Sequence, residues 1–415
     1  MRLGTATIAD TILVGASVLI LPSFLFSKAI TSVCLGLFVI AGALYPLNDG
    51  RISTHRSYHG LLLTLVFGVS LLSGWNSTDT SEWIHILILR LPFVLLPLAF
   101  WVMPDQSTDR LVRVHLHLLL VLVVAAIPQL FFFFHHLDTH LEMLSRGQPI
   151  STPIEHVKYS MINAYGVISS AYFLSKRESI SARLRPYIIG GSLLLFVFMH
   201  LLAVRTGLGI CYVSIMALYG WQYLKSGSYI RFIALFTGIL ALAVTAYSVV
   251  PSIKHKVHYM LYDWRMWSEN GGVSYADSER IISFRAALQV WLDHPWWGVG
   301  AGDVRETLLG PEGPLYLLQK LPHNQFLLTL TGSGLIGLLL FTIGFYGLLW
   351  SRNMTHRGLL LLLYLNYTLS FMVENSLERS VTTAFFLFFA MWIALVTTPD
   401  GQTNTAYHQD WRKAD

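Results

Sequence analysis

Residues 294–327, HPWWGVGAGDVRETLLGPEGPLYLLQKLPHNQFL, span the end of the one long polar segment of this chain and the start of the apolar run after it. The segment begins at Pro251 and closes at Pro322, and it is rich in Trp, Tyr, Gly and Arg. The sequence on both sides of it consists of apolar runs. This arrangement predicts a long loop outside the membrane, between two groups of membrane-spanning helices.

The overall composition indicates the same class of protein. Hydrophobic residues make up 54% of the 415 positions and charged residues only 12%, which is too apolar for a soluble domain of this size. Cys34 and Cys211 both lie in apolar runs and define no disulfide framework. The net charge of +5 fits basic residues at helix ends and gives no sign of nucleic-acid binding. We therefore expect an all-α polytopic membrane protein.

Apolar runs long enough to cross a hydrocarbon core of roughly 30 Å predict about twelve transmembrane helices. The expected spans are residues 8–26, 29–47, 58–74, 82–102, 111–134, 158–175, 187–203, 206–224, 229–250, 323–350, 358–374 and 379–397. The first run lacks a small-residue cleavage site, so we expect it to remain as a helix.

Basic residues in the short connections predict the orientation of these spans. With a cytoplasmic N-terminus, fifteen Lys and Arg lie inside: Arg2, Arg51, Arg56, Arg110, Arg113, Lys176, Arg177, Arg183, Arg185, Lys225, Arg231, Arg352, Arg357, Arg412 and Lys413. Five lie outside: Lys28, Arg146, Lys158, Arg205 and Arg379. The excess of positive charge inside predicts that both termini are cytoplasmic.

The orientation gives an expected domain organisation. Residues 1–250 form helices one to nine, and residues 251–322 form a periplasmic loop between helices nine and ten. Residues 323–397 form helices ten to twelve, and residues 398–415 a cytoplasmic tail. The loop lies outside because long loops translocate largely regardless of their charge.

The long loop is expected to contain an amphipathic helix from about Asp277 to Asp293, with Asp277 or Ser278 capping its start. Apolar residues recur there at helical spacing: Ile281, Phe284, Leu288, Trp291 and Leu292. The His294–Asp303 segment then breaks the helix and supplies glycines for close backbone approach. Such a helix can lie along the membrane face as a lid over a cleft.

Two arginines are candidates for binding a diphosphate, which needs permanent charge and planar donors. Arg205 lies between two spans with almost no loop around it, where the alternative is an arginine that reaches lipid phosphate. Arg280 lies near the start of the loop helix and is expected to point toward the membrane domain, unless it pairs with Glu279 or Asp277. Arg285 is a further candidate on the opposite edge of that helix.

His323 is the candidate for proton transfer because it opens the tenth span at the outer face of the membrane. An imidazole there can take up or release a proton near neutral pH, or it can instead bond the loop backbone. Asn324 beside it is placed to orient the ring or to bind a sugar hydroxyl.

Further ionisable residues near the same face have two explanations each. Arg90, within the fourth span, either pairs with a carboxylate or reaches a phosphate. Lys158, at the start of the sixth span, either lines an acceptor entrance or anchors the helix at the interface. His135, His136 and His140, with Asp138 and Glu142, are either metal ligands or a hydrated helix end, and no metal site is expected there.

The loop and its exit resemble the signature region of the O-antigen ligase and O-antigen polymerase superfamily. The residues that carry the resemblance are Arg280, Trp291, Pro295–Asp303, His323–Leu327, Gly332, Gly334 and Gly337. The predicted twelve spans, the large loop between helices nine and ten, and an arginine before helix eight are similar as well. The resemblance implies an integral membrane glycosyltransferase with a GT-C type fold.

The resemblance also implies roles and partners. Arg205 and Arg280 would bind the diphosphate of an undecaprenyl-diphosphate-linked polysaccharide, and His323 would be the base that activates the acceptor hydroxyl. Family members often have Ser or Thr before the first arginine, whereas this chain has Val204. The Glu374–Arg379 turn resembles a stretch in one branch of the superfamily, which makes Arg379 a further candidate for substrate binding.

The expected activity is O-antigen ligation to a lipid A-core acceptor in the bacterial inner membrane, with the active site facing the periplasm. The partners are then the lipid-linked donor, the acceptor and membrane lipids, without nucleic acid. A lipid diphosphate is a stable leaving group, so charge binding and alignment suffice and no metal or other cofactor is expected. The sequence accordingly has no Asp-x-Asp motif and no glycine-rich phosphate loop.

Three alternatives remain. A polymerase would use the same donor with a second lipid-linked glycan as acceptor, and the sequence does not separate it from a ligase. A transporter would show paired halves and ionisable residues at the midplane, neither of which is found here. A nonenzymatic assembly factor would leave Arg205, Arg280 and His323 unexplained.

Overall fold

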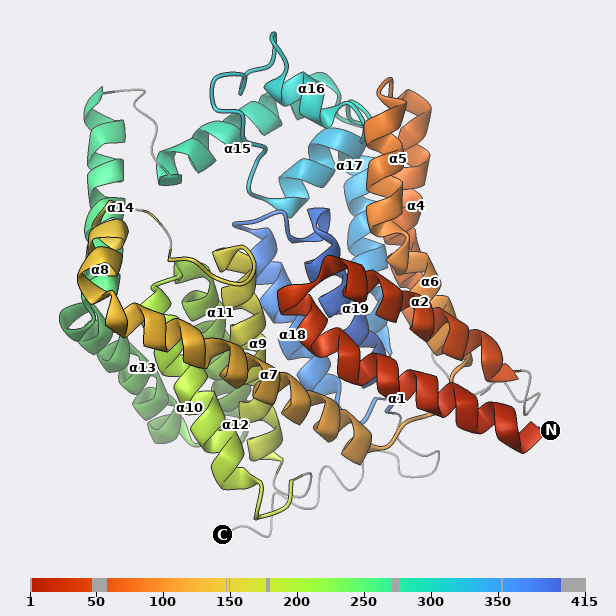
Figure 1. The fold of residues 1–415 in the computed structure, drawn as a ribbon. Helices are drawn as coiled ribbons and strands as arrows, with labels where there is room; N and C mark the ends of the chain where they lie inside the picture. Colours follow the sequence, from red (N-terminus) through yellow and green to blue (C-terminus); the bar gives the residue numbers. More distant parts are fainter. Residues whose placement is uncertain are drawn as a thin grey trace.

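The computed structural model describes residues 2–46, 58–146, 148, 150–176, 180–270, 276–351 and 354–396. All regular structure in these ranges is helical, without a strand, and the helices pack into one bundle (Figure 1). The helices of the first half are α1 (Arg2–Phe26), α2 (Lys28–Leu44), α4 (Thr64–Leu72), α5 (Thr80–Arg90), α6 (Pro92–Val102), α7 (Thr108–His135), α8 (Leu137–Ser145) and α9 (His156–Ser175). Those of the second half are α10 (Arg185–Leu202), α11 (Arg205–Ile215), α12 (Trp221–Lys225), α13 (Tyr229–Val249), α14 (Pro251–Asn270), α15 (Ala276–Asp293), α16 (Val304–Leu309), α17 (Gln325–Tyr346), α18 (Arg357–Phe371) and α19 (Ser380–Ala394).

The membrane-spanning character is confirmed by the lengths and hydropathies of the helices. Seven described segments are long and apolar enough to cross a membrane: Ile8–Phe26, Tyr58–Asn76, Thr80–Val102, Thr108–His135, Arg185–Leu202, Tyr229–Val249 and Gln325–Trp350. The other five predicted spans coincide with α2, α9, α11–α12, α18 and α19, which are shorter or less apolar. The protein is an all-α polytopic membrane protein. The expected cytoplasmic tail lies outside the described residues.

Helix α9 shows why a span can be less apolar than its neighbours. It packs against α7, α10, α11 and α18, and most of its residues are buried. Its polar side chains, among them Ser160, Asn163 and Ser169, therefore face protein and not lipid. Helix α13 is the opposite case, because only 6% of its span is buried. Its uniformly apolar surface is what contact with lipid requires.

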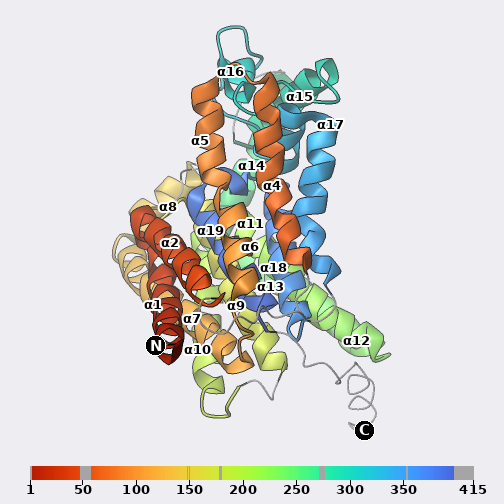
Figure 2. The ribbon, with the colours of Figure 1, turned by 90° about the vertical axis from the view of Figure 1, so that its right-hand side faces the viewer.

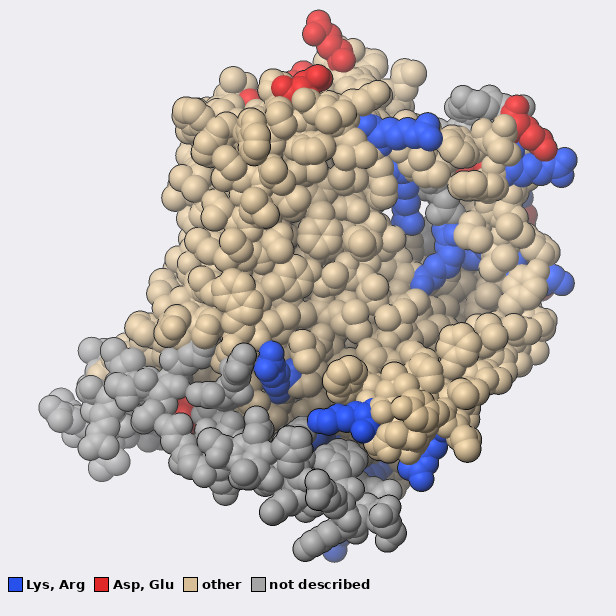
Figure 3. All heavy atoms as spheres, turned by 180° about the vertical axis from the view of Figure 1, so that it is seen from behind, with Lys and Arg blue, Asp and Glu red and all other residues tan. Residues whose placement is uncertain are grey.

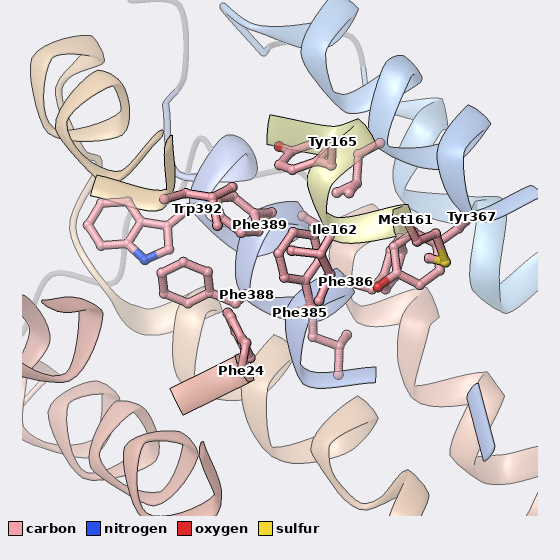
Figure 4. Packing of buried hydrophobic residues seen from close by; sticks show 14 of the residues in the cluster. Phe24, Met161, Ile162, Tyr165, Tyr367, Phe385, Phe386, Phe388, Phe389 and Trp392 are labelled. Carbon is pink, nitrogen blue, oxygen red and sulfur yellow. The ribbon is translucent and has the colours of Figure 1, made fainter. Parts of the chain in front are cut away.

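Helix α19 forms the centre of the core. Every residue from Val381 to Ile393 is buried, so the helix is surrounded on all sides. Its aromatic rings meet those of neighbouring helices. The ring centroids of Phe24 and Phe385 are 5.3 Å apart (Figure 4), and those of Phe345 and Phe386 are 4.6 Å apart. Pairs at these separations add stabilisation beyond the area that they bury.

The polar segment forms a lid over one end of the bundle, built from α14, α15 and α16 (Figures 1 and 2). We call the described residues of 251–322 the lid, and the part of the bundle that they cover the lid end. The lid has a small apolar core of its own, to which α17 adds Leu328. The core residues are Ala286, Val290, Val304, Leu308, Leu309, Leu315 and Leu328.

The glycine-rich motif fixes the lid to a break in α17. Val299 and Gly300 donate backbone hydrogen bonds to the carbonyls of Thr331 and Gly332, each over 3.0 Å. Leu335 donates in return to the carbonyl of Pro295 over 2.9 Å. The helix opens for these bonds at Gly334, whose φ of 62° and ψ of −167° are accessible essentially to glycine alone.

The same motif also holds the hairpin between α4 and α5. The Asp303 carboxylate accepts hydrogen bonds from the backbone amides of Thr78 and Asp79, both over 2.7 Å, just before α5 begins. The Asn76 side chain donates to the carbonyl of Gly298 over 3.1 Å. The motif thus joins the lid to α17 and to the α4–α5 hairpin.

Helix α15 confirms the helix predicted in the loop, but the face that it buries differs from the predicted one. The buried residues against α17 and the lid core are mostly small, namely Ser283, Ala286 and Ala287 with Val290, whereas Leu288 and Leu292 are exposed. Close packing of two helices selects small residues at the contact. The predicted cap at Asp277 or Ser278 is wrong, because α15 already begins at Ala276. The amide and hydroxyl of Ser278 instead donate to the buried Asp263 carboxylate of α14 over 3.2 and 2.7 Å.

Replacing Gly334 with alanine tests the backbone hydrogen bonds between the glycine-rich motif and α17. An added Cβ would lie 2.2 Å from the backbone of Trp296 and would strain the positive φ. We expect a loss of about 1–3 kcal/mol in stability, measured as a lower melting temperature in detergent. Gly238→Ala in α13 is the control, because a Cβ there meets nothing within 4 Å. Equal melting temperatures for the two variants would contradict a stabilising role of these hydrogen bonds.

Candidate functional site

A cavity of about 440 Å³ lies at the lid end, between the bundle and the lid. Its walls come from the start of α9, the α10–α11 turn, α14, α15 and the end of α18. The lining residues are Ile150, His156, Val157, Leu202, Ala203, Val204, Arg205, Thr206, Gly209, Ile210, Val213, Lys256, Arg280, Leu369 and Val373. Seen from behind, Lys and Arg side chains gather around a hollow on this side of the molecule (Figure 3).

Arg205 enters this cavity from a very tight turn. Only Ala203 and Val204 separate α10 from α11, and Ala203 adopts a left-handed conformation with φ of 51°. That conformation costs an alanine roughly 1–2 kcal/mol and is the kind of local strain found at functional sites. Gly207 packs so closely on α9 that a Cβ would lie 2.6 Å from Ser160. The position of Arg205 is therefore fixed by the bundle.

The lid supplies the other cations. Arg280 from α15 and Lys256 from α14 line the cavity together with Arg205. The structure thus brings Arg205 and Arg280 to one cavity, as expected from the sequence. Among the described lining residues there is no Asp or Glu, so the cavity has the electrostatic character of an anion site.

His323 lies at the edge of this region and pairs with a buried carboxylate. Its Nδ1 is 3.4 Å from Oε1 of Glu374, while its side chain keeps about a third of its surface exposed. Asn324 accepts a hydrogen bond from the Leu327 amide and so caps α17, which sets the direction in which the chain enters the helix. The amide of Asn324 also donates to the carbonyl of Met372 over 3.3 Å.

Electrostatic interactions of Glu374 relate the His323–Glu374 pair to the cavity. Burial acts to raise the pKa of Glu374, but the hydrogen bond and charge of His323 and the charge of Lys158 outweigh it and hold the pKa below its ordinary value. Glu374 and Arg280 both act electrostatically on His156, which lines the cavity. Val373, the neighbour of Glu374, is also in the lining. The carboxylate is thus ionised beside a positively charged cavity.

Arg90 has the carboxylate partner that was one of its two expected explanations. Its guanidinium lies 2.6 Å from Oε1 of Glu378 and 2.6 Å from the Ser70 hydroxyl. Gln325 donates to the same Glu378 oxygen over 3.2 Å and accepts from the Leu377 amide over 2.9 Å. Arg90 is not among the lining residues, and its network joins the Glu374–Arg379 turn to the start of α17.

The remaining candidates are not among the described lining residues of the cavity. Lys158 is buried and pairs with the carboxylate of Glu155. Arg379 precedes α19, where its carbonyl accepts from the Thr383 amide. Arg285 is exposed and lies over the ring of Trp267, with 5.6 Å between guanidinium and ring centroid.

The histidines near residue 140 pack on aromatic rings. His135 stacks on Phe131 and His140 on Phe133, with ring centroids 5.8 and 5.7 Å apart. In the described part of the chain, no three His, Cys, Asp or Glu side chains are grouped as metal ligands would be. The cluster therefore resembles a packed helix end.

Two residues of the site were missed in the sequence or left without a role: Lys256 and Glu374. The sequence does contain a signal for Glu374. A carboxylate at the end of a span, on the same side as His323, is unfavourable in free energy and therefore marks a functional candidate. Lys256 has no separate signal, since it is one of several cations near the start of the polar segment. His156 lies two residues before Lys158, and the sequence places both either at an acceptor entrance or at the membrane interface; the structure places His156 in the cavity lining.

Comparison with known proteins supports the resemblance. Residues 190–342 match the family model described as O-antigen ligase. The matched stretch includes Arg205, Lys256, Arg280 and His323, whereas His156 and Glu374 lie outside it. The resemblance to the O-antigen ligase and polymerase superfamily is thereby confirmed. No curated protein matches the chain.

Arg90→Met tests whether Arg90 acts through the fold. Removing one partner of a buried pair leaves the other charge uncompensated, so we expect a loss of about 3–5 kcal/mol, seen as a lower melting temperature. Adding Glu378→Gln should recover part of that loss. Arg146→Met removes an exposed pair with Glu142 and should change little. Unchanged stability with lost donor binding would instead make Arg90 a substrate-binding residue.

Proposed function

We propose that this chain is a membrane glycosyltransferase of GT-C type that transfers a glycan from an undecaprenyl-diphosphate-linked donor to a lipid A-core acceptor. The observation that carries the proposal is the cavity in which Arg205, Arg280 and Lys256 converge beside the His323–Glu374 pair. The match to the O-antigen ligase family supports it. We further propose that the site faces the periplasm of the inner membrane and that both termini are cytoplasmic, as the distribution of basic residues predicts.

The proposed role of the cavity is to hold the donor diphosphate. Arginine forks bind phosphate oxygens through paired, charge-assisted hydrogen bonds, and Lys256 adds a point charge. Negative charge on the diphosphate increases as the bond to the sugar breaks. Cations fixed at this position therefore stabilise the transition state more than the ground state, which is what accelerates the reaction.

The proposed role of His323 is to take the proton of the acceptor hydroxyl. Because Nδ1 faces the Glu374 carboxylate, the ring is oriented with its N–H toward Glu374 and with Nε2 free to accept a proton. The hydroxyl oxygen then attacks the anomeric carbon of the donor. The bond from that carbon to the diphosphate oxygen breaks, and the diphosphate leaves with the electron pair. Glu374 stabilises the imidazolium that forms.

A transfer assay with purified protein tests the reaction. We expect His323→Ala to lower kcat by about 10²–10⁴-fold, since it removes proton transfer. Arg205→Ala and Arg280→Ala should each lower it by about 10²–10³-fold, since they remove charge stabilisation. Arg285→Ala is the control, because Arg285 stacks on Trp267 outside the cavity.

The acceptor decides between ligase and polymerase. The assay therefore contains lipid-linked donor with and without lipid A-core, and the products are separated by size. Transfer to lipid A-core is the expected result. Growth of a ladder on the donor without transfer to lipid A-core would establish the polymerase activity, and full activity of His323→Ala would remove the proposed base.

The variant Glu374→Gln tests whether Glu374 positions His323 or binds the donor. We expect kcat to fall while KM for the donor changes little, because Glu374 touches His323 and not the cavity cations. In the folded protein the pKa of Glu374 lies below its ordinary value. The ionised carboxylate therefore stabilises the fold at pH values above the ordinary pKa. This contribution is lost as the pH falls through the pKa of the folded state. The difference in melting temperature between wild type and variant should accordingly shrink as the pH is lowered below the ordinary carboxyl pKa of 4.5. A constant difference would contradict the pairing.

A further inference from the structure

His156 is an ionisable side chain of the cavity lining to which the reaction proposed above gives no role. The other ionisable side chains among the described lining residues are Arg205, Lys256 and Arg280. Arginine and lysine ordinarily stay charged at neutral pH, whereas an imidazole gains or loses a proton there. His156 can therefore supply the anion site with a proton as well as with charge.

Two helices of the bundle begin at this cavity. His156 is the first residue of α9 and Arg205 the first residue of α11, and the two helices pack against each other. The N-terminal end of a helix carries a partial positive charge, so both helix ends favour an anion at the cavity. An anion that Arg205 binds in this volume of about 440 Å³ is thus brought close to the ring of His156.

Charged residues from several elements surround His156. They are Glu155 and Lys158, which pair beside it at the start of α9, Arg205 of α11, Lys256 of α14, Arg280 of α15 and Glu374 after α18. Helices α7 and α10 also pack on α9, but they add no charged side chain to the described lining. The ring therefore lies within reach of the charges of both the anion site and the His323–Glu374 pair.

These charges make the protonation of His156 depend on what the cavity holds. Burial lowers the pKa of His156, and the charges of Lys256 and Arg280 lower it further, while Glu155 and Glu374 oppose them. A cavity without an anion thus favours the neutral ring. A diphosphate bound there offsets the two cations and favours the charged ring instead.

The leaving group of the proposed reaction can accept such a proton. When the bond to the sugar breaks, the oxygen left on the diphosphate becomes a terminal phosphate oxygen. The second pKa of a phosphate monoester is about 6, close to the unperturbed pKa of about 6.5 of an imidazole. Proton transfer between groups of similar pKa is the arrangement that general acid catalysis requires.

We propose that His156, in its charged form, gives a proton to the diphosphate oxygen as the bond to the sugar breaks; the inference rests on the proposed function. The electron pair of the broken bond stays on this oxygen, which then binds the proton of the imidazolium. The acceptor hydroxyl gives its own proton to His323 in the same reaction. One proton is thus lost by His156 and one is gained by His323, so no further reactant is needed.

The two histidines consequently work in opposite protonation states. His323 has to be neutral before the reaction and His156 charged. Their surroundings differ in the corresponding way, because the side chain that His323 contacts is the Glu374 carboxylate, whereas His156 lies at the site where the dianionic donor is proposed to bind. Glu374 acts on both rings, directly on His323 and through its charge on His156.

The test varies the basicity of the leaving group. Two donors carry the same glycan and the same lipid, but the oxygen between the two phosphorus atoms is replaced by CH₂ in one and by CF₂ in the other. The CH₂ group makes the released oxygen more basic, and the CF₂ group keeps it close to that of the diphosphate. Single-turnover rates are measured, so that product release does not enter, for wild type, His156→Gln and the control His258→Gln. His258 is exposed on α14 and is not among the described lining residues.

We expect His156→Gln to lower the rate with the natural donor by about 10²-fold, at the lower end of the range for proton transfer. The ratio of the CF₂ rate to the CH₂ rate should increase about tenfold in this variant, because a basic leaving group depends most on the proton donor. His258→Gln should leave rate and ratio unchanged. A loss of rate with an unchanged ratio in His156→Gln would overturn the inference, since a structural or binding role affects both donors equally.

Wild type alone gives a second measurement, which does not depend on the folding of a variant. As the pH rises and His156 loses its proton, the ratio of the CF₂ rate to the CH₂ rate should increase. A ratio that is independent of pH would contradict proton donation by His156.

Binding separates this inference from the proposed function. Undecaprenyl diphosphate is bound to the protein in two buffers with different enthalpies of ionisation, and calorimetry gives the protons taken up. Wild type and His258→Gln should take up more protons than His156→Gln. Equal uptake in a protein that transfers the glycan would overturn the inference alone, whereas a wild type that transfers no glycan from the natural donor would overturn the proposed function as well.

Discussion

The position of the lid depends on one exchange of backbone hydrogen bonds. Residues of the glycine-rich motif bond to α17 where that helix opens at Gly334, and the bonds would be impossible if the helix continued. A polar backbone group buried without a partner is costly, so the break in α17 and the motif stabilise each other. The glycines are therefore structural: they bring the lid close enough to hold Arg280 over the bundle, while the anion site is built from side chains elsewhere.

Several ionisable residues gather at the lid end. Arg205, Lys256 and Arg280 line the cavity, and no Asp or Glu is among its described lining residues. Arg90 pairs with Glu378, and Lys158 pairs with Glu155. The Arg90–Glu378 pair connects α5 with the turn before α19, whereas the Lys158–Glu155 pair lies at the start of α9. The charge of Lys158 also acts on Glu374 and so on the His323–Glu374 pair.

Much of this architecture follows from local sequence signals. Apolar runs predict the spans, the recurrence of Phe284 and Leu288 predicts a helix in the loop, and the placement of Arg205 and Arg280 predicts their convergence. Contacts between distant parts of the chain could not be predicted in the same way. Glu374 meets His323 across 51 residues of sequence, and the face that α15 buries depends on α17. Hydropathy identifies the large residues of α15, whereas its packing uses the small ones.

The cations of the cavity belong to two parts of the fold, since Arg205 comes from the bundle and Lys256 and Arg280 come from the lid. Like charges repel, and an anion between them turns that repulsion into attraction. Binding of the diphosphate proposed above would therefore be coupled to the position of the lid against the bundle, and each would favour the other by the same factor. The ligand itself would then act as an electrostatic latch between the two parts.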